Sequence, residues 1–303
     1  MTAVGFMGFG EVAACFSAAL IRNGVPVTAY DILLDQFGGM EVLKKRAAGS
    51  NVTFLPLHEV IASSRFVISS VTSDVAREVA IACVPHLNAD QVFIDLNATS
   101  PAVKRDIAVK LSASGLQFVE GAILSAIGVS GAQSRVLVCG HKAALVANTL
   151  SKHGLNVKYY GADIGRASTF KLLRSIFSKG VEALLLEARL AARQTGLDGE
   201  VWREIVDTLD GHEFSEIGGN WMRSHGTAHA RRYHEMVQVE ALVQELGIDP
   251  LMTRATTAFF ERSTRLCLSQ ALRSRPRTPE DVLAALEELL PNAMSDSRLN
   301  GAT

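Results

Sequence analysis

The sequence has few cysteines and almost no net charge, and each scarcity excludes a class of protein. The formal net charge is −1 and no block of basic residues occurs, so nucleic acid is not an expected partner. The cysteines lack CxxC spacing, which is typical of reduced thiols in a cytoplasmic protein. We expect all four to fill the core: Cys15, Cys83, Cys139 and Cys267.

Long apolar runs are also missing. The most apolar helical stretch, residues 181–192, contains Glu182, Glu187 and Arg189, so it is too short and too charged to span a bilayer. The first residues run straight into a strand without a charged leader or cleavage pattern, so no secretory signal is expected. We therefore expect a cytoplasmic protein without a membrane partner, and 303 residues predict two domains.

The N-terminus carries a dinucleotide-binding fingerprint. Residues 3–6 are an apolar run typical of a buried strand, and Gly8-x-Gly10-x-x-Ala13 follows, before an amphipathic helical pattern. Gly8 suits the tight turn, Gly10 allows backbone to approach a pyrophosphate, and Ala13 lets the helix pack close to the sheet. The helix N-terminus then points its N–H groups at the phosphates.

Asp31 sharpens the choice of cofactor. It ends the second apolar strand, residues 25–30, where a carboxylate hydrogen-bonds the adenosine ribose. A carboxylate repels a 2′-phosphate, and Ile32, Leu33 and Leu34 supply no compensating cation. We therefore predict NAD as the cofactor, with NADP less favoured.

Short strands and helices alternate as far as residue 160, which predicts a doubly wound, mostly parallel sheet. Residues 73–83 are expected to form a helix capped by Ser73 or Asp74. The fold class is therefore α/β, with a Rossmann domain over residues 1–162 and an all-helical domain over residues 163–303. The helices expected in the second domain are residues 164–195, 199–208, 227–246, 250–270 and 279–290, followed by a frayed tail from Asn292.

A candidate general base lies on the first of these helices. Lys171, Arg174, Ser175 and Ser178 recur at i, i+3, i+4 and i+7, so they share one face. Arg174 one turn from Lys171 is a like charge that favours the neutral amine. Spacing alone leaves open a second interpretation, in which these residues form an ordinary solvent-exposed stripe of the helix.

Polar residues follow the predicted strands of the first domain, where ligands of doubly wound sheets bind. Thr72 comes after one strand, Asn97 after the next, and Ser125 lies in a loop of small residues. Each is equally explicable as a helix cap.

Two clusters of residues in the second half of the chain are candidate binding sites, one for a metal ion and one for an anion. His225 and His229 are four residues apart, but no third ligand or HExxH pattern supports a metal, so none is predicted. A charged group follows on the same expected helix, and it is either solvated surface or a site for an anion. Its members are Arg231, Arg232, His234 and Glu235.

Together these segments resemble the β-hydroxyacid dehydrogenase superfamily, which includes 6-phosphogluconate dehydrogenase and 3-hydroxyisobutyrate dehydrogenase. Residues 5–10 look like the opening of the family, and residues 95–101 look like its D-x-S-T-x-x-P segment with Asn97 and Ala98 in place of Ser and Thr. Residues 120–126 resemble its D-A-P-V-S-G-G loop and keep Ser125. The second half most resembles a branch with a 6-phosphogluconate-dehydrogenase-like C-terminal domain.

The resemblance also implies a catalytic residue. Gly161 and Gly165 followed by Lys171 look like the motif that carries the catalytic lysine of the family. Arg174 and Ser175 stand where the family has two asparagines, and His234 aligns with a lysine that closes the site. The implied substrate-binding residues are Ser125, Asn97, Arg174, Ser175 and His234. The expected cofactor-binding residues are Gly8, Phe9, Gly10, Glu11, Val12, Asp31, Val71, Thr72 and Ala98.

The predicted function is hydride transfer between a nicotinamide cofactor and a small hydroxyacid or related alcohol, with Lys171 as general acid and base. A carboxylate-bearing small molecule is the expected substrate, and the resemblance implies a homodimer or tetramer built through the helical domain. Two alternatives are an imine reductase or reductive aminase, which rarely keeps this lysine, and an NAD(P)-binding protein without turnover.

Overall fold

The computed structural model describes residues 2–272 and 274–299 and divides into two compact units, Met1–Ile176 and Phe177–Thr303. The chain passes from the first unit to the second within helix α8 (Arg166–Gln194). The predicted functional boundary at residue 162 stays a prediction.

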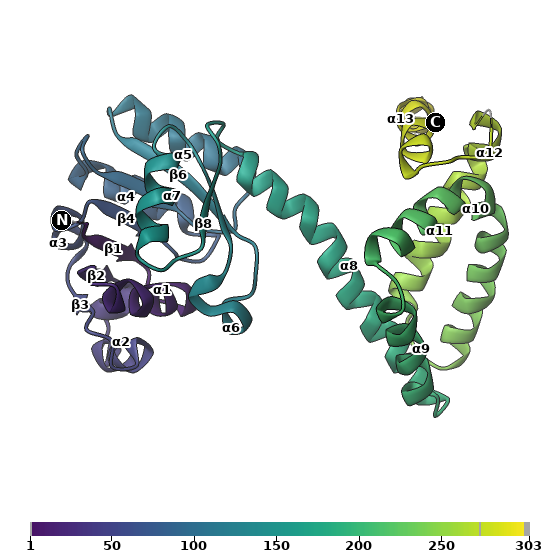
Figure 1. Cartoon of the computed structure of the whole chain (residues 1–303), viewed down its shortest axis with the longest axis horizontal. Helices are drawn as coiled ribbons and strands as arrows, with labels where there is room; N and C mark the ends of the chain where they lie inside the picture. The colour runs from purple at the N-terminus through teal and green to yellow at the C-terminus, as the bar shows by residue number, and fades with distance from the viewer. Residues whose placement is uncertain (1, 273, 300–303) are drawn as a thin grey trace. The chain divides into compact units, whose positions relative to one another are not determined.

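The first unit contains one eight-stranded sheet in the order β3-β2-β1-β4-β5-β6-β7-β8 (Figure 1). Neighbouring strands are parallel except for β6 and β7, which are antiparallel. This confirms the predicted doubly wound, mostly parallel α/β fold, because the order reverses at β1. The strands are β1 (Val4–Met7), β2 (Val27–Tyr30), β3 (Thr53–Phe54), β4 (Phe66–Ser69), β5 (Val92–Asp95), β6 (Gln117–Ile123), β7 (Val136–Cys139) and β8 (Val157–Gly161).

Helices cover both faces of the sheet, and each face has its own apolar core. One core joins the strands to α1 (Glu11–Arg22), α2 (Gly39–Ala47) and α7 (Ala143–Lys152). The other core joins them to α3 (Leu57–Ala62), α4 (Ala76–Cys83) and α5 (Pro101–Ala113). The central strands are apolar on both faces because they are buried on both faces. The C-terminal ends of β1, β4, β5 and β6 therefore meet at one edge.

The predicted cap of α4 was wrong. The helix begins at Ala76, and neither Ser73 nor Asp74 caps it. Asp74 instead accepts a hydrogen bond from the Thr72 hydroxyl, which lowers the pKa of its carboxyl. The turn at residues 71–75 is thus closed by its own side chains before the helix starts.

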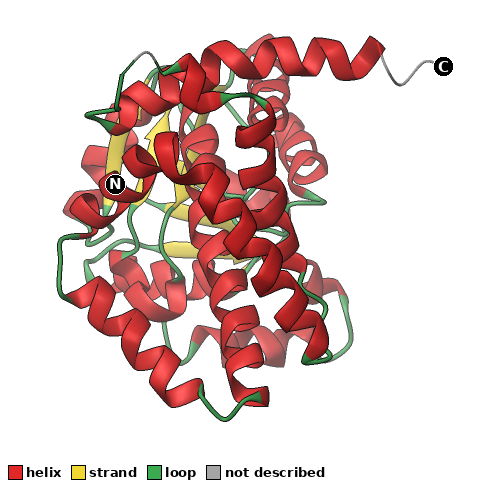
Figure 2. Ribbon diagram, turned by 90° about the vertical axis from the view of Figure 1, so that its right-hand side faces the viewer, coloured by secondary structure: helices red, strands yellow, loops and turns green. Residues whose placement is uncertain are grey.

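Among the residues described, every strand belongs to the first unit, and the second unit consists of helices and loops. Figure 2 shows the strands in yellow and the helices, which make up most of the chain, in red. No described helix is long and apolar enough to cross a membrane. The helices after α8 are α9 (Asp198–Asp210), α10 (Phe214–Glu245), α11 (Leu251–Arg265), α12 (Leu268–Ala271) and α13 (Pro279–Leu299).

Three details of this unit differ from expectation. Helix α10 starts at Phe214 and not at Thr227. Gly226 therefore lies inside the helix, at a position where a Cβ would lie 2.6 Å from Leu272. The helix expected over residues 250–270 is broken at Cys267, whose φ is +53°. The tail expected to fray from Asn292 is helical to Leu299, and residues 300–303 lie outside the described chain.

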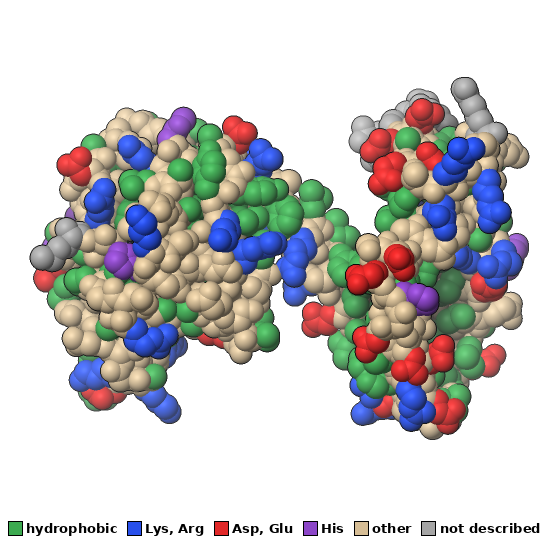
Figure 3. Space-filling model, in the orientation of Figure 1, with side chains coloured by type: hydrophobic (Ala, Val, Ile, Leu, Met, Phe, Trp, Pro, Cys, Tyr) green, Lys and Arg blue, Asp and Glu red, His purple; other side chains and the backbone are tan. Residues whose placement is uncertain are grey.

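Surface apolar residues are numerous in the second unit, where green side chains lie among the charged ones (Figure 3). Cys267 is also exposed, so the expectation that all four cysteines fill the core was wrong for this one. The remaining thiols are buried or half-buried, and all four are free.

Candidate active site

The turn between β1 and α1 has the geometry that the fingerprint predicts. Gly8 has a φ of +85°, and a Cβ there would lie 2.6 Å from Val71 and 2.9 Å from the Ser70 carbonyl oxygen. No atom lies within 4 Å of the position that a Cβ on Gly10 would take. No side chain caps the N-terminus of α1. Its first N–H groups can therefore receive an anion.

Asp31 lies beside this turn, and its carboxylate is hydrogen-bonded within the protein. Oδ2 accepts from the Phe9 N–H at 2.7 Å, and Oδ1 accepts from the Leu33 N–H at 3.0 Å. Each carboxylate oxygen retains a second lone pair, so a ribose hydroxyl can still donate to Asp31.

A cation that the sequence did not signal also reaches the turn. Arg46, on α2, donates from Nη1 to the Phe9 carbonyl oxygen at 3.2 Å. It lies fifteen residues beyond Asp31, so it is not among the residues directly after the strand, where a cation for a 2′-phosphate is expected. Arg46 is exposed, and it contacts the backbone of Phe9, whose N–H donates to Asp31.

One cavity of about 270 Å³ gathers residues from five segments of the first unit. Its polar residues are Ser70, Asn97, Ser125 and Lys171, and its apolar residues are Val12, Val71, Leu96, Ala98, Ile123 and Ile127. Six of the residues that the sequence singled out therefore share one cavity: Val12, Val71, Asn97, Ala98, Ser125 and Lys171. Ser70 was not singled out, although it ends the same strand as Val71; its hydroxyl donates to the Gly8 carbonyl oxygen at 3.1 Å.

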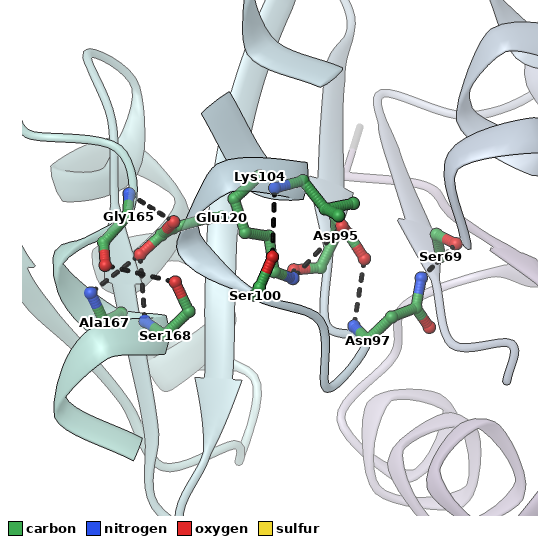
Figure 4. Close-up of polar contacts among 10 residues, drawn as sticks. Ser69, Asp95, Asn97, Ser100, Lys104, Glu120, Gly165, Ala167 and Ser168 are labelled. Atoms are coloured by element: carbon green, nitrogen blue, oxygen red, sulfur yellow. Dashed lines mark hydrogen bonds and ion pairs between the residues drawn. The ribbon is translucent and has the colours of Figure 1, made fainter. Parts of the chain in front are cut away.

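The turn after β5 is held by a buried polar network (Figure 4). Asp95 Oδ1 accepts from the Asn97 N–H at 2.9 Å, and Asn97 Nδ2 donates to Ser69 Oγ at 2.9 Å. Lys104 Nζ donates to the Asp95 carbonyl oxygen at 2.9 Å. It also lies 3.1 Å from Asp95 Oδ2, as an ion pair without the alignment of a hydrogen bond.

Asn97 presents an acceptor that the protein leaves unpaired. Its Oδ1 is buried and has no hydrogen-bond partner, while its Nδ2 is occupied by Ser69. A buried acceptor without a partner is costly unless a ligand supplies a donor. Because Asn97 lines the cavity, that donor can come from a bound molecule.

Glu120, in the middle of β6, fixes the start of α8. Its carboxylate accepts from the backbone N–H groups of Gly165 at 2.5 Å, Ala167 at 2.7 Å and Ser168 at 3.2 Å. Glu120 is fully buried, and a carboxylate at a helix N-terminus is favourable. This contact sets the direction in which α8 presents Lys171, one turn further on.

Lys171 is half-buried, and its pKa is lowered first by burial and second by the positive charge of Lys104. The like charge that lowers this pKa is Lys104, so the prediction that Arg174 supplies it is not confirmed. Lys104 was not predicted to belong to the site because lysine side chains are usually exposed to solvent. Its spacing to Ile107 and Leu111, which share the buried face of α5, was the available signal.

The other predicted substrate residues lie elsewhere. Arg174 Nη1 donates to the Leu124 carbonyl oxygen at 2.5 Å, directly before Ser125. The Ser175 hydroxyl is occupied by the Lys171 carbonyl oxygen at 2.8 Å. His234 is exposed on α10 in the second unit, with its ring 5.2 Å from that of Tyr233. Their contact with substrate stays a prediction.

The remaining predicted cofactor residues surround the turn. Phe9 is buried edge-on against Phe54, at 4.9 Å between ring centroids. Glu11 is exposed in the first turn of α1. Thr72 is exposed in the turn after β4 and does not line the cavity.

The paired histidines of α10 make structural contacts. His225 Nε2 lies 2.9 Å from Ser263 Oγ, and His229 Nδ1 lies 2.9 Å from the His225 carbonyl oxygen. In the part of the chain that the structure describes, no group of three or more histidine, cysteine, aspartate or glutamate residues is placed to hold a metal. In the neighbouring charged group, Arg231 pairs with Glu235, and Arg232 donates to Ser224 at 2.8 Å.

The sequence of the first unit matches a known family. Residues 3–161 match the NAD binding domain of 6-phosphogluconate dehydrogenase. The chain belongs to this family. It is thus a member of the NAD(P)-dependent hydroxyacid dehydrogenases, as the sequence motifs predicted. Residues 192–263, in the second unit, match a domain of unknown function, DUF1932.

Curated relatives cover most of the chain. An uncharacterized 28.5 kDa protein of Methanothermus fervidus is 29% identical, over 85% of this chain and 97% of its own. The mitochondrial 3-hydroxyisobutyrate dehydrogenase of Drosophila melanogaster is 27% identical, over 69% of this chain and 64% of its own.

Solved structures give the same fold. A conserved hypothetical protein from Sinorhizobium meliloti 1021 is 29% identical with a TM-score of 0.59, over 94% of this chain and 96% of its own. A protein described as structurally similar to 3-hydroxyacid dehydrogenases is 31% identical with a TM-score of 0.56, over 88% and 99%. A reductive aminase from Aspergillus terreus has a TM-score of 0.71, over 88% and 94%, but only 18% identity, a likeness of fold alone.

Proposed function

We propose that this protein is an NAD-dependent dehydrogenase that oxidises or forms a small hydroxyacid, with Lys171 as general base and acid. The observation that carries the proposal is the cavity that Lys171 shares with Ser125, Asn97 and residues from α1 and from the end of β4. In a doubly wound sheet this is where a cofactor and its substrate meet.

The residues present fit a dinucleotide. The uncapped N-terminus of α1 and the open space at Gly10 suit a pyrophosphate, and Asp31 suits the adenosine ribose. Bound NAD supplies the hydride acceptor. The preference for NAD is part of the proposal, because Asp31 places a carboxylate where NADP has a phosphate.

The chain supplies proton transfer and orientation. The Lys171 amine, whose pKa is lowered, accepts the hydroxyl proton during oxidation and returns it during reduction. Asn97 Oδ1 accepts a hydrogen bond from the bound molecule. Ser125 Oγ, which accepts from the Arg135 N–H at 3.3 Å, can donate its own proton to the substrate.

A carboxylate on the substrate has a candidate partner in Arg174. The Leu124 carbonyl oxygen takes one of its N–H donors, and guanidinium has five in a planar fork. We propose that the remaining donors hold the carboxylate next to Ser125.

Lys171→Met tests the role of Lys171, because methionine keeps the aliphatic stem and removes the amine. Turnover of a responsive hydroxyacid should fall by about 10²–10⁴-fold, while the Kd for NADH, measured by fluorescence titration, should remain unchanged. The matched control is Lys179→Met on the same helix, since Lys179 is exposed and pairs with Glu182. Near-normal turnover of Lys171→Met refutes the proposed role.

Imine reduction is the rival activity, and the fold shared with the A. terreus reductive aminase keeps it worth testing. A panel of hydroxyacids with NAD and NADP, beside cyclic imines with NADH and NADPH, separates the two. Turnover confined to the imines would replace the dehydrogenase proposal. Binding of NADH without turnover of any compound would favour a protein that only binds the cofactor.

A further inference from the structure

Lys104 has no part in the chemistry proposed above, yet it is fully buried in the first unit. A buried ammonium group is costly unless it is paired. Its two contacts are both with Asp95, one to the carbonyl oxygen at 2.9 Å and one to Oδ2 at 3.1 Å. These contacts fix the residue that starts the turn bearing Leu96, Asn97 and Ala98.

Two buried carboxylates make the position of Lys104 significant. Asp95 on β5 and Glu120 on β6 are neighbours in the strand register, and both are fully buried. Glu120 is satisfied by the N–H groups that open α8. In Figure 4 the Lys104 ammonium group contacts Asp95, while the Glu120 carboxylate faces the start of α8.

Glu120 and Asp95 are connected to Lys171 through the start of α8 and through the turn after β5. Ala167, whose N–H donates to Glu120, lies one helical turn before Lys171. Asp95 holds the turn whose next three residues line the cavity together with Lys171. Lys104 is therefore a buried cation in contact with the residue that starts this turn. The pKa of Lys171 is lowered first by burial and second by the charge of Lys104.

We propose that Lys104 is a positioning residue of this site: its buried ammonium group holds the turn at residues 95–98 in place and keeps the Lys171 amine in its neutral, proton-accepting form. This inference rests on the proposed role of Lys171 as general base. Lys104 acts through Asp95 and Lys171.

The charged groups around Lys171 determine the sign of the effect. Burial and the positive charge of Lys104 on α5 lower the pKa of Lys171, whereas the carboxylates of Asp95 and Glu120 would favour its ammonium form if they were unpaired. Asp95 is paired with Lys104, and the Glu120 carboxylate is hydrogen-bonded to the first N–H groups of α8. Removing the charge of Lys104 should therefore raise the pKa of Lys171.

Competitive labelling with trace acetic anhydride measures this directly. The acetylation of Lys171 is quantified by mass spectrometry from pH 6 to 10 in the wild type, Lys104→Met, Lys104→Arg and Asp95→Asn/Lys104→Met. The double variant leaves no buried carboxylate unpaired, so it is informative if Lys104→Met fails to fold. Lys110→Met, on the last turn of the same helix, is the matched control.

The midpoint of Lys171 labelling should rise in Lys104→Met, which slows labelling at pH 8 by about threefold or more for a shift of half a pKa unit. The double variant should shift it less and in the same direction, while Lys104→Arg and Lys110→Met should leave it unchanged. The acid limb of kcat/KM for oxidation should move with the labelling midpoint. Circular dichroism shows which of Lys104→Met and the double variant folds. If the midpoint of Lys171 labelling is unchanged in a variant that folds, the inference is overturned.

The two proposals can fail separately. Labelling does not require turnover, so an active Lys171→Met enzyme would end the proposed catalytic role and leave the labelling result standing. Conversely, a fixed labelling midpoint would remove Lys104 from the mechanism and leave Lys171 as the base.

Discussion

The substitution Glu120→Gln tests how α8 is held in the orientation that carries Lys171. Glutamine has nearly the same volume as glutamate, so the core around β6 stays filled. It lacks the negative charge, and its amide nitrogen cannot accept a hydrogen bond. The two carboxylate oxygens now accept from the N–H groups of Gly165, Ala167 and Ser168. In the variant an amide nitrogen takes the place of one of these oxygens, so two hydrogen-bond donors would face each other there.

The magnitude follows from the contacts. A hydrogen bond to a charged group contributes about 1.5–3 kcal/mol, and a carboxylate at a helix N-terminus contributes up to about 2 kcal/mol. Glu120 is fully buried, so solvent does not screen these terms. At least one bond and the charge are lost, and we expect the free energy of unfolding to fall by about 2–4 kcal/mol.

Urea unfolding followed by far-UV circular dichroism measures that loss. Hydrogen exchange of peptides covering residues 163–170 should rise as well, because Glu120 is the acceptor for three of their amides. Glu41→Gln is the matched control, since Glu41 is exposed and makes only an i,i+3 pair with Lys44; it should change stability by less than about 0.5 kcal/mol. A Glu120→Gln variant as stable as this control would refute the anchoring role of Glu120.

Two further predictions concern the cofactor and the second unit. Arg46→Ala should weaken NADPH binding by about 3–10-fold and NADH binding less, because Arg46 contacts Phe9 beside Asp31 and its charge would favour a 2′-phosphate. Fluorescence titrations with Lys45→Ala as control measure both affinities, and equal losses would exclude a role in phosphate binding. His225 is buried and its pKa is lowered to about 4, first by desolvation, so its stabilising contribution is complete above pH 6.5 and is lost as the pH falls towards 4. The second unit should lose about 3 kcal/mol over that range, and tryptophan fluorescence during urea unfolding should show a flatter pH dependence in His225→Gln; an equal dependence in both proteins would place the titrating group elsewhere.

The sequence was sufficient for the fold because its signals are local. The glycine turn at Gly8, the alternation of apolar strands and helices, and Asp31 at a strand end are each read within a few residues. The failures in the second unit were also local misreadings: Gly226 was taken as outside a helix, although it lies inside α10 to allow close packing with Leu272.

The candidate site was harder to predict because its supporting residues are decided by packing in three dimensions. Ser125, Asn97 and Lys171 could be chosen by motif, and the structure places them in one cavity. The contact of Arg46 with the Phe9 carbonyl oxygen spans 37 residues, and that of Glu120 with α8 spans more than 40. No spacing rule connects such pairs.

Lys104 shows what would have been needed. Its side chain suits solvent by residue type, but Ile107 and Leu111 repeat at i+3 and i+7, so the helical pattern places a lysine on the buried face. A charge on an apolar face requires a buried partner of opposite sign, and Asp95 is the acidic residue that ends the preceding strand. Pattern and charge together therefore point to the ion pair, and the proton-accepting form of Lys171 depends on a residue that hydropathy alone assigns to the surface.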